Sequence, residues 1–243
     1  MRLIIREDCD AVSEYMATYI KNRILEFNPT PEKPFVLGLP TGSSPIGVYK
    51  NLVKYHKNGE LSFQNVVTFN MDEYVDLEKE CTDFEVSIKA AGGIELFLGG
   101  IGPDGHIAFN EPGSSLNSRT RVKTLAYDTI LANSRFFEND ISKVPRMALT
   151  VGVGTVMDAR EVAVIITGAH KAIALAKCIE EGINHMWTVS AIQNHPKALI
   201  VCDEDATLEL HVKTVKYFKS IEHVIKNLIG AENVGLQGNI KFT

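Results

Sequence analysis

The stretch Ile94-Glu-Leu-Phe-Leu98-Gly-Gly-Ile-Gly-Pro-Asp104-Gly-His106-Ile-Ala-Phe-Asn-Glu111-Pro112 joins an apolar run to a glycine-rich loop. The apolar run is typical of a buried strand. The glycines and the proline that follow predict an irregular loop, whose backbone can approach a ligand closely. A histidine held between two acids can be fixed in one tautomer and can exchange protons near neutral pH. The stretch therefore predicts a catalytic loop carrying Asp104, His106 and Glu111, with a capped tight turn as the alternative.

Strand-like and helix-like patterns alternate on both sides of this loop. Short apolar runs bounded by glycine or polar residues predict strands, whereas apolar residues three and four positions apart predict helices. Such alternation favours an α/β fold, in which a mostly parallel sheet is covered by helices on both faces. The predicted strands are 35–39, 66–69, 94–98, 148–151, 162–167 and 198–202, and the predicted helices are 11–27, 83–91, 169–181 and 207–218, with a further helix beginning near Pro45.

Composition and charge narrow the class of protein. The chain has 243 residues, a hydrophobic fraction of 45% and a formal net charge of −5. These values are ordinary for a soluble globular protein. The lack of a basic block argues against nucleic acid or an anionic membrane as the main partner. The four cysteines are far apart, and no stretch has the pattern of a signal peptide or membrane span, so we expect reduced thiols and a cytoplasmic protein.

The chain is predicted to fold as one domain over residues 1–219. No internal repeat, low-complexity tract or linker divides this range. Residues 220–243 have weak hydrophobic periodicity, so we expect a C-terminal tail that is disordered in part.

Three further polar loops are predicted at the carboxyl ends of the strands, where parallel α/β sheets bind ligands. Gly42, Ser43 and Ser44 precede a helix, and free N–H groups there could hold a phosphate, with a capped turn as the alternative. Asp72, one of two adjacent acids, suits a general base or a helix cap. Lys171 follows another strand and a glycine, and suits either a phosphate-binding cation or a solvated helix position.

Seven motifs make the chain resemble glucosamine-6-phosphate deaminases. They are GLPTGSSP at 38–45, FNMDEY at 69–74, GGIGPDGHIAFNEPGSS at 99–115, SRTRVKT at 118–124, ALTVGVGT at 148–155, ITGAHKA at 166–172 and NHMWTVSA at 184–191. The FNEP sequence separates the chain from the related 6-phosphogluconolactonases. The resemblance covers residues 1–219 and implies a modified doubly wound α/β fold. It also implies conversion of glucosamine 6-phosphate to fructose 6-phosphate and ammonia, without a metal or an organic cofactor.

The resemblance implies a role for each residue in the matching motifs. His106 would open the pyranose ring by moving a proton between O5 and O1, while Asp104 and Glu111 would orient the imidazole. Asp72 would move a proton between C2 and C1 of the open sugar. The residues implied to bind the substrate phosphate are Gly42, Ser43, Ser44, Arg135 and Lys171.

The resemblance also implies assembly and regulation. Many members of the family are hexamers, so we expect a homo-oligomer. Some members bind N-acetylglucosamine 6-phosphate as an activator at subunit contacts. The positions that match this activator site are Ser114, Arg121, Lys123, Thr124 and Tyr217. A solvated strand face is the alternative explanation of the cations in this stretch.

One segment departs from the family pattern. After Tyr74 the family continues with a glycine-containing loop, a helix and a strand, whereas here residues 75–80 lead directly into the predicted helix. We therefore expect a few tens of residues to be absent next to Asp72, which would expose core and sheet-edge groups. Two alternatives to an active deaminase follow. One is a shortened form that binds sugar phosphates with little or no turnover, and the other is a hydrolase resembling the 6-phosphogluconolactonases.

Overall fold

The computed structural model describes residues 1–69 and 76–229. In this part of the chain the strands are β1 (Arg2–Arg6), β2 (Phe35–Gly38), β3 (Val66–Val67), β4 (Leu96–Gly100), β5 (Arg121–Thr124), β6 (Met147–Thr150), β7 (Val162–Ile166) and β8 (Ala198–Asp203). The α-helices are α1 (Cys9–Phe27), α2 (Ile46–Lys57), α3 (Leu77–Ala90), α4 (Tyr127–Asn133), α5 (Val153–Met157), α6 (Ala172–Ile179) and α7 (Val212–Ile229). Short 3₁₀ helices are η1 (Ser134–Phe136), η2 (Ile141–Lys143), η3 (Ala169–Lys171), η4 (Thr188–Asn194) and η5 (Asp205–Thr207).

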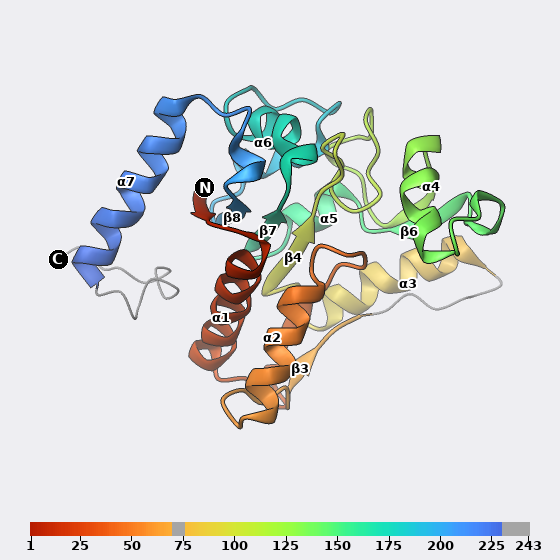
Figure 1. The fold of residues 1–243 in the computed structure, drawn as a ribbon. Coiled ribbons are helices and arrows are strands. Elements are labelled where there is room, and N and C mark those ends of the chain that lie inside the picture. The colour runs from red at the N-terminus through yellow and green to blue at the C-terminus, as the bar shows by residue number, and fades with distance from the viewer. Residues whose placement is uncertain (70–75, 230–243) are drawn as a thin grey trace.

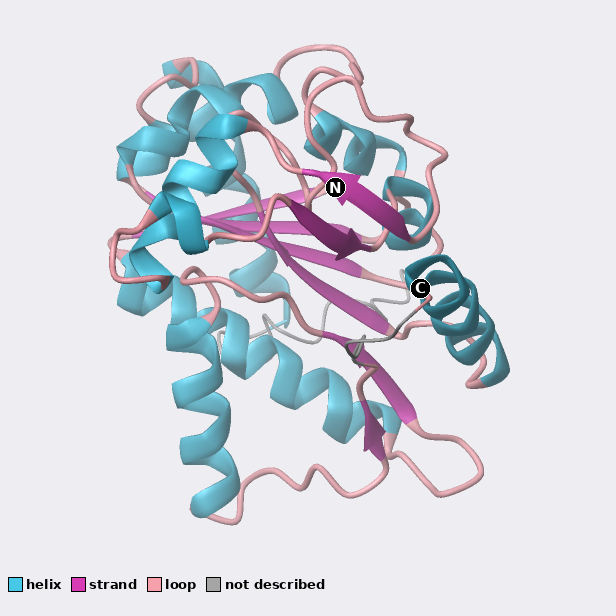
Figure 2. Cartoon of the chain, turned by 90° about the vertical axis from the view of Figure 1, so that its right-hand side faces the viewer, coloured by secondary structure: helices cyan, strands magenta, loops and turns pink. Residues whose placement is uncertain are grey.

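A parallel sheet forms the centre of the protein (Figure 1). Its strands pair in the order β1-β8-β7-β4-β2-β3, and all of these pairs are parallel. Figure 2, turned by 90°, shows helices on both sides of the sheet. Strands β5 and β6 form a separate antiparallel pair. The prediction of an α/β fold with a mostly parallel sheet is therefore confirmed.

Apolar side chains fill both faces of the sheet. Helices α1 and α2 pack on the face that presents Leu37 and Val201. Helices α3, α5 and α6 pack on the face that presents Val36 and Ile200. Successive residues of a strand point to opposite faces. Because both faces are covered, the central strands are apolar throughout, and this is the continuous pattern that the sequence shows.

The connections of β2 and β4 leave the sheet on opposite faces. The two strands are parallel neighbours, with Leu37 opposite Leu96. Strand β2 leads to α2 on one face, whereas the chain after β4 leads by way of β5, α4 and β6 to α5 on the other. Such a reversal opens a crevice beyond the carboxyl ends of two neighbouring strands, where doubly wound folds bind ligands. The loops 39–45 and 101–111 leave the sheet at this point.

Several strands differ from the sequence-based expectations. The predicted strand 148–151 corresponds to β6, but β6 pairs antiparallel with β5 instead of joining the parallel sheet. Strand β1 was not predicted, because it is short and flanked by Arg2 and Arg6; its pairing with β8 holds it in the sheet. Strand β4 lies two residues beyond the predicted 94–98, since Gly99 and Gly100 continue the ladder with β7.

Helix boundaries also differ. Helix α3 begins before the predicted 83–91, because the Asp76 carboxylate caps it by accepting the backbone N–H of Lys79 at 3.0 Å. Residues 77–80, expected to be a connector, are therefore helical. Helix α7 replaces the predicted helix 207–218 and crosses the predicted domain boundary at residue 219. An ion pair of 2.7 Å between Arg6 and Glu222 fixes its second half to β1.

Two further features of the fold are the length and hydropathy of its helices and the state of its cysteines. None of the helices in the described part is both long and apolar enough to cross a membrane. All four cysteines are free thiols, as predicted. Burial raises the pKa of Cys178 and of Cys202 to about 12. Since the thiolate is the reactive form, these two thiols are inert at neutral pH, whereas Cys9 is exposed.

Tyr19→Phe is expected to lower the free energy of unfolding by about 1.5–3 kcal/mol, the range for a hydrogen bond to a charged group. The Tyr19 hydroxyl donates to the buried Glu161 carboxylate at 2.8 Å, and phenylalanine keeps the ring but removes this bond. Tyr55→Phe is the matched control, because its hydroxyl meets the neutral hydroxyl of Thr18 at 2.9 Å. Urea unfolding of both variants checks the prediction, and equal losses would contradict it.

Candidate active site

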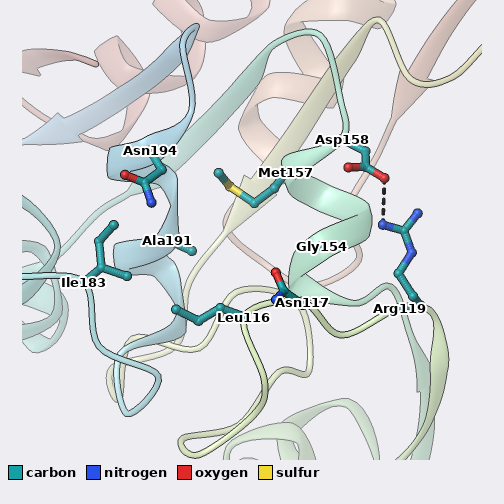
Figure 3. Close-up of a pocket in the computed structure, with 9 residues that line it drawn as sticks. All are labelled: Leu116, Asn117, Arg119, Gly154, Met157, Asp158, Ile183, Ala191 and Asn194. Atoms are coloured by element: carbon teal, nitrogen blue, oxygen red, sulfur yellow. Dashed lines mark hydrogen bonds and ion pairs between the residues drawn. The ribbon is translucent and has the colours of Figure 1, made fainter.

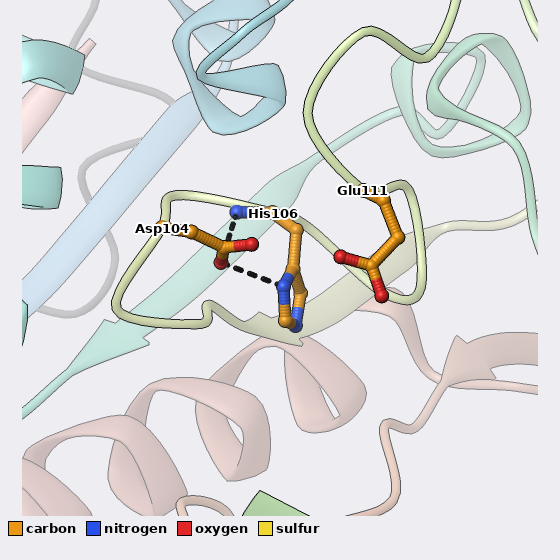
Figure 4. Close-up of side chains that lie close together, drawn as sticks. All are labelled: Asp104, His106 and Glu111. Atoms are coloured by element: carbon orange, nitrogen blue, oxygen red, sulfur yellow. Dashed lines mark hydrogen bonds and ion pairs between the residues drawn. The ribbon is translucent and has the colours of Figure 1, made fainter. Parts of the chain in front are cut away.

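The loop after β4 brings Asp104, His106 and Glu111 together (Figure 4). Nδ1 of His106 lies 2.7 Å from Oδ1 of Asp104, and the same oxygen accepts the backbone N–H of His106 at 3.3 Å. Nitrogen and oxygen atoms of the three side chains lie within 4.8 Å of one another, a spacing that would also suit a metal ion. The Asp104 carboxylate lies against Nδ1 as a charge contact, outside the geometry of a hydrogen bond from the ring, and Nε2 is the nitrogen left to exchange a proton with a ligand.

Two glycines make room for this arrangement. A methyl group at Gly102 would lie 2.3 Å from Cε1 of His106 and 2.6 Å from Oδ1 of Asp104, so any side chain there would displace the pair. Gly105 has a φ of +75°, and a methyl group there would lie 2.6 Å from the Trp187 ring. The loop can therefore fold back on itself only with glycine at these two positions.

The two acids differ in their surroundings. Burial raises the pKa of Asp104, but the hydrogen bonds and positive charge of His106 outweigh burial and hold that pKa below its usual value. Glu111 is buried, and its Oε1 accepts the backbone N–H of Ala126 at 3.1 Å. Oε2 of Glu111 has no hydrogen-bond partner among residues 1–69 and 76–229. Because an unpaired buried carboxylate oxygen is unfavourable, Glu111 is suited to accept a hydrogen bond from a bound ligand.

Two cations and two hydroxyls meet at the loop between β2 and α2. Arg135 donates through Nη2 to Oγ of Ser43 at 3.0 Å, and Nζ of Lys171 donates to Oγ of Ser44 at 3.0 Å. Lys171 is buried, and burial together with the charge of Arg135 lowers its pKa. Gly42, in the same loop, has a φ of +102°, which favours glycine. An anion bound here would relieve the repulsion between the two cations.

The two clusters lie at the same edge of the sheet. A methyl group at Gly100 would lie 3.6 Å from Cβ of Ser44, so Ser44 packs on the last residue of β4. Gly102, two residues further along, begins the turn that holds His106. A candidate proton-transfer group therefore lies next to a candidate anion site of two cations and two hydroxyls, at the carboxyl ends of β2 and β4, where doubly wound folds bind ligands. This arrangement suits a small phosphorylated substrate.

Comparisons with known proteins give the family. The family described as glucosamine-6-phosphate isomerases/6-phosphogluconolactonase matches residues 74–201. The human protein named glucosamine-6-phosphate deaminase 1 is 62% identical over 266 aligned positions, which cover 94% of this chain and 92% of the human protein. The chain belongs to this family. Glucosamine-6-phosphate deaminase 2 of Xenopus tropicalis is 61% identical, and the alignment covers 94% of this chain and 97% of the frog protein.

Solved structures of the family share the fold. A structure described as a monomeric glucosamine-6-phosphate deaminase matches with a TM-score of 0.80 at 31% identity, and covers 86% of this chain and 100% of that chain. A 6-phosphogluconolactonase from Trypanosoma cruzi matches with a TM-score of 0.61 at 16% identity, and covers 86% of this chain and 96% of that chain. The second match shows a common fold only.

The alignments also bear on the expected missing segment. The alignment with the frog deaminase extends over 266 positions, more than the 243 residues of this chain. That relative therefore carries residues without a counterpart here, which agrees with the expected loss of a family segment. The family match begins at residue 74, where the sequence pattern places the break. Asp72 lies outside the described residues, so its role as the base that moves a proton between C2 and C1 stays a prediction.

The five residues of the predicted activator site do not all lie together within a single chain. Arg121 lies on β5 and donates to Oδ1 of Asn110 at 2.9 Å, and burial lowers its pKa. Lys123 and Thr124 follow on β5. Ser114 is buried, and its hydroxyl has no partner among the described residues. Tyr217 belongs to α7, which lies on the opposite side of the molecule from β6, the partner of β5 (Figure 1).

Sequence reasoning missed Asn110. This residue is fully buried, and its Nδ2 donates to the carbonyls of Ile107 at 2.9 Å and Val151 at 2.8 Å. Its Oδ1 accepts the bond from Arg121, so Asn110 connects the predicted activator arginine to the catalytic loop. Its place in the FNEP motif was the available signal, but an asparagine in a loop does not by itself predict burial.

A separate cavity of about 280 Å³ lies between residues 116–119, α5 and η4 (Figure 3). Leu116, Met157 and Ile183 line it, and an ion pair of 2.6 Å between Arg119 and Asp158 lies beside them. No residue predicted for catalysis, phosphate binding or activation is among its lining residues in the described chain. The cavity and the candidate acid–base groups therefore lie at different places in the fold.

Proposed function

We propose that this protein is a glucosamine-6-phosphate deaminase, which converts glucosamine 6-phosphate and water to fructose 6-phosphate and ammonia. The observation that carries the proposal is the Asp104–His106 pair, 2.7 Å apart, at the same sheet edge as the cationic cluster around Ser43 and Ser44. The 62% identity with human glucosamine-6-phosphate deaminase 1 supports the choice of substrate.

Ring opening is assigned to His106. The C1–O5 bond of the sugar breaks, O5 receives a proton, and the O1 hydroxyl loses one to leave an aldehyde at C1. One acid–base group close to both oxygens can carry out both transfers. Asp104 holds the imidazole in position for this step, and the buried Oε2 of Glu111 is placed to accept a hydrogen bond from the sugar or the ring.

Proton transfer along the open sugar is assigned to Asp72. Its carboxylate takes the proton from C2, which gives an enolamine, and a proton is then returned to C1. C2 is left as an iminium carbon; water adds there, and ammonia leaves to give the ketone. The phosphate stays bound by Ser43, Ser44, Arg135 and Lys171, which keeps C1 and C2 close to the acid–base groups.

Ammonia release from glucosamine 6-phosphate by the purified chain tests the proposal, with hydrolysis of 6-phosphogluconolactone measured in parallel. Ammonia release with little lactone hydrolysis is the expected result. Lactone hydrolysis alone would overturn it in favour of the hydrolase. Tight binding of glucosamine 6-phosphate without release of ammonia would instead favour the non-catalytic shortened form.

Lys171→Ala is expected to raise KM for the phosphorylated sugar about 10- to 150-fold, because truncating a buried contact to a charged group costs about 1.5–3 kcal/mol. Turnover of free glucosamine, which has no phosphate, should not change. Lys219→Ala is the matched control, since that lysine is paired with Glu204 on the surface, far along the chain from the site. An unchanged KM in Lys171→Ala would show that Lys171 does not bind the substrate phosphate.

Assembly, regulation and location complete the proposal. We propose a homo-oligomer, hexameric as in many members of the family, although one similar solved structure is described as monomeric. A second sugar phosphate, N-acetylglucosamine 6-phosphate, is proposed as effector at Ser114, Arg121, Lys123 and Thr124. Because Tyr217 lies on the far side of the chain, it would complete this site only from a neighbouring copy. The protein is proposed to be cytoplasmic.

A further inference from the structure

We infer that Thr188 is a positioning residue that holds the His106 loop in its reactive shape. This inference rests on the proposed function for its kinetic consequences. Thr188 is fully buried at the start of η4, and its hydroxyl contacts loop residues that lie 78 and 81 positions away in sequence. Its side chain contacts the backbone of the loop that carries His106.

The Thr188 hydroxyl bonds to the loop at two points. Oγ1 accepts the backbone N–H of Ile107 at 3.2 Å and donates to the backbone carbonyl of Asn110 at 2.8 Å. Next to it, the backbone N–H of Val189 donates to the carbonyl of Gly105 at 3.0 Å. These three bonds fall on both sides of His106, so residues 188 and 189 hold the segment that carries the imidazole.

The loop needs such support because of its backbone. Ala108, between the two points held by Thr188, has a φ of +51°, which is unfavourable for a residue with a side chain. A conformation of this kind persists only where the surroundings fix it. One hydroxyl that binds residues 107 and 110 together closes the loop across Ala108. Without it, a buried N–H and a buried carbonyl would each lose a partner, which favours rearrangement.

The position of Thr188 is itself fixed by packing. Val189 and Ile192, which follow it in η4, are buried in the core on one face of the sheet. Trp187, which precedes it, lies against Gly105, so that no side chain could be accommodated there. The hydroxyl is therefore presented to the loop from a rigid element, as a positioning group must be.

Thr188→Val tests the inference, because valine keeps the shape and removes the hydroxyl, while Thr188→Ser keeps the hydroxyl. Small displacements of a catalytic group can cost about 10²-fold. We expect Thr188→Val to lower kcat on ring-closed glucosamine 6-phosphate about 10- to 100-fold, with KM little changed and a smaller loss on an acyclic analogue. Thr188→Ser should restore most of kcat. Thr207→Val is the control, since Thr207 lies in η5 and, within the described residues, its hydroxyl bonds only to the carbonyl of Glu204, the residue before η5.

A second measurement separates this inference from the proposed function. Nitrogen-15 NMR of the imidazole reports which ring nitrogen of His106 carries the proton, and it needs no turnover. We expect one dominant tautomer in the parent chain and in Thr188→Ser, and a mixture in folded Thr188→Val. An unchanged tautomer in Thr188→Val, or equal kinetic losses in Thr188→Val and Thr207→Val, would overturn the positioning role. Absence of ammonia release by the parent chain would instead overturn the proposed function alone.

Discussion

His106→Gln is expected to lower turnover of ring-closed glucosamine 6-phosphate by about 10²- to 10⁴-fold, the range for loss of a general acid–base group. Glutamine has a similar reach and can still form hydrogen bonds, but it cannot carry a proton between O5 and O1. The effect should fall on kcat, because the phosphate is held separately by Ser44 and Lys171, whose contact of 3.0 Å does not involve the histidine.

Turnover of an acyclic analogue of the substrate shows whether the loss of turnover in His106→Gln comes from the ring-opening step. That analogue enters the reaction after the step assigned to His106, so its turnover should fall far less than that of the ring-closed sugar. His211→Gln is the matched control, since His211 is also paired with a carboxylate, Glu180 at 2.6 Å, but is exposed. Equal losses on the two substrates would remove His106 from ring opening.

Much of the site was predictable because its parts are local in sequence. Asp104, His106 and Glu111 lie within eight residues, in a loop whose glycines could be recognised as breakers. The limit of this reasoning is visible at Gly99 and Gly100. They read as the start of the loop, but they continue β4, because a parallel ladder with β7 uses backbone groups and needs no side chain.

Contacts between distant segments account for what the sequence did not predict. Strand β5 pairs with β6 some 25 residues later, and neither strand has a pattern that distinguishes it from one in the parallel sheet. Glu85 of α3 accepts bonds from the backbone N–H and the hydroxyl of Thr120 at 2.9 and 2.6 Å, and so joins α3 to the segment just before β5. Nothing in the local sequence around Glu85 distinguishes it from a solvated helix residue.

The topology of a parallel sheet explains why the sequence could place the His106 cluster and the phosphate-binding cluster at one edge, although their side-chain contacts were not known. Ser43, Asp104 and Lys171 each follow an apolar strand of the parallel sheet, and parallel strands end at one edge, so the proximity of these residues follows from topology. Which hydroxyl meets which cation does not follow, because side-chain pairing depends on the path of each loop. Arg135, in η1 directly after α4, reaches Ser43 from an element that the sequence pattern did not predict.

Asp72→Asn is expected to lower deamination by about 10²- to 10⁴-fold, while the dissociation constant for the substrate stays within a few-fold. Asparagine keeps the size of the side chain but cannot accept the proton from C2. Exchange of the C2 proton with solvent deuterium should therefore be lost together with turnover. Substrate binding should persist, because the residues proposed to bind the phosphate belong to other segments of the chain.

Asp76→Asn is the matched control for Asp72→Asn. It makes the same chemical change four residues along the chain, where the carboxylate caps α3 by accepting the N–H of Lys79 at 3.0 Å. Asparagine caps helices about as well as aspartate, so stability and turnover should both be retained. Near-normal turnover or deuterium exchange in Asp72→Asn would show that another group is the base. Loss of turnover in both variants would instead indicate that the segment before α3 had been disturbed. Asp72 is proposed to act as the base and Asp76 caps the helix, so these two separate roles do not explain the same loss.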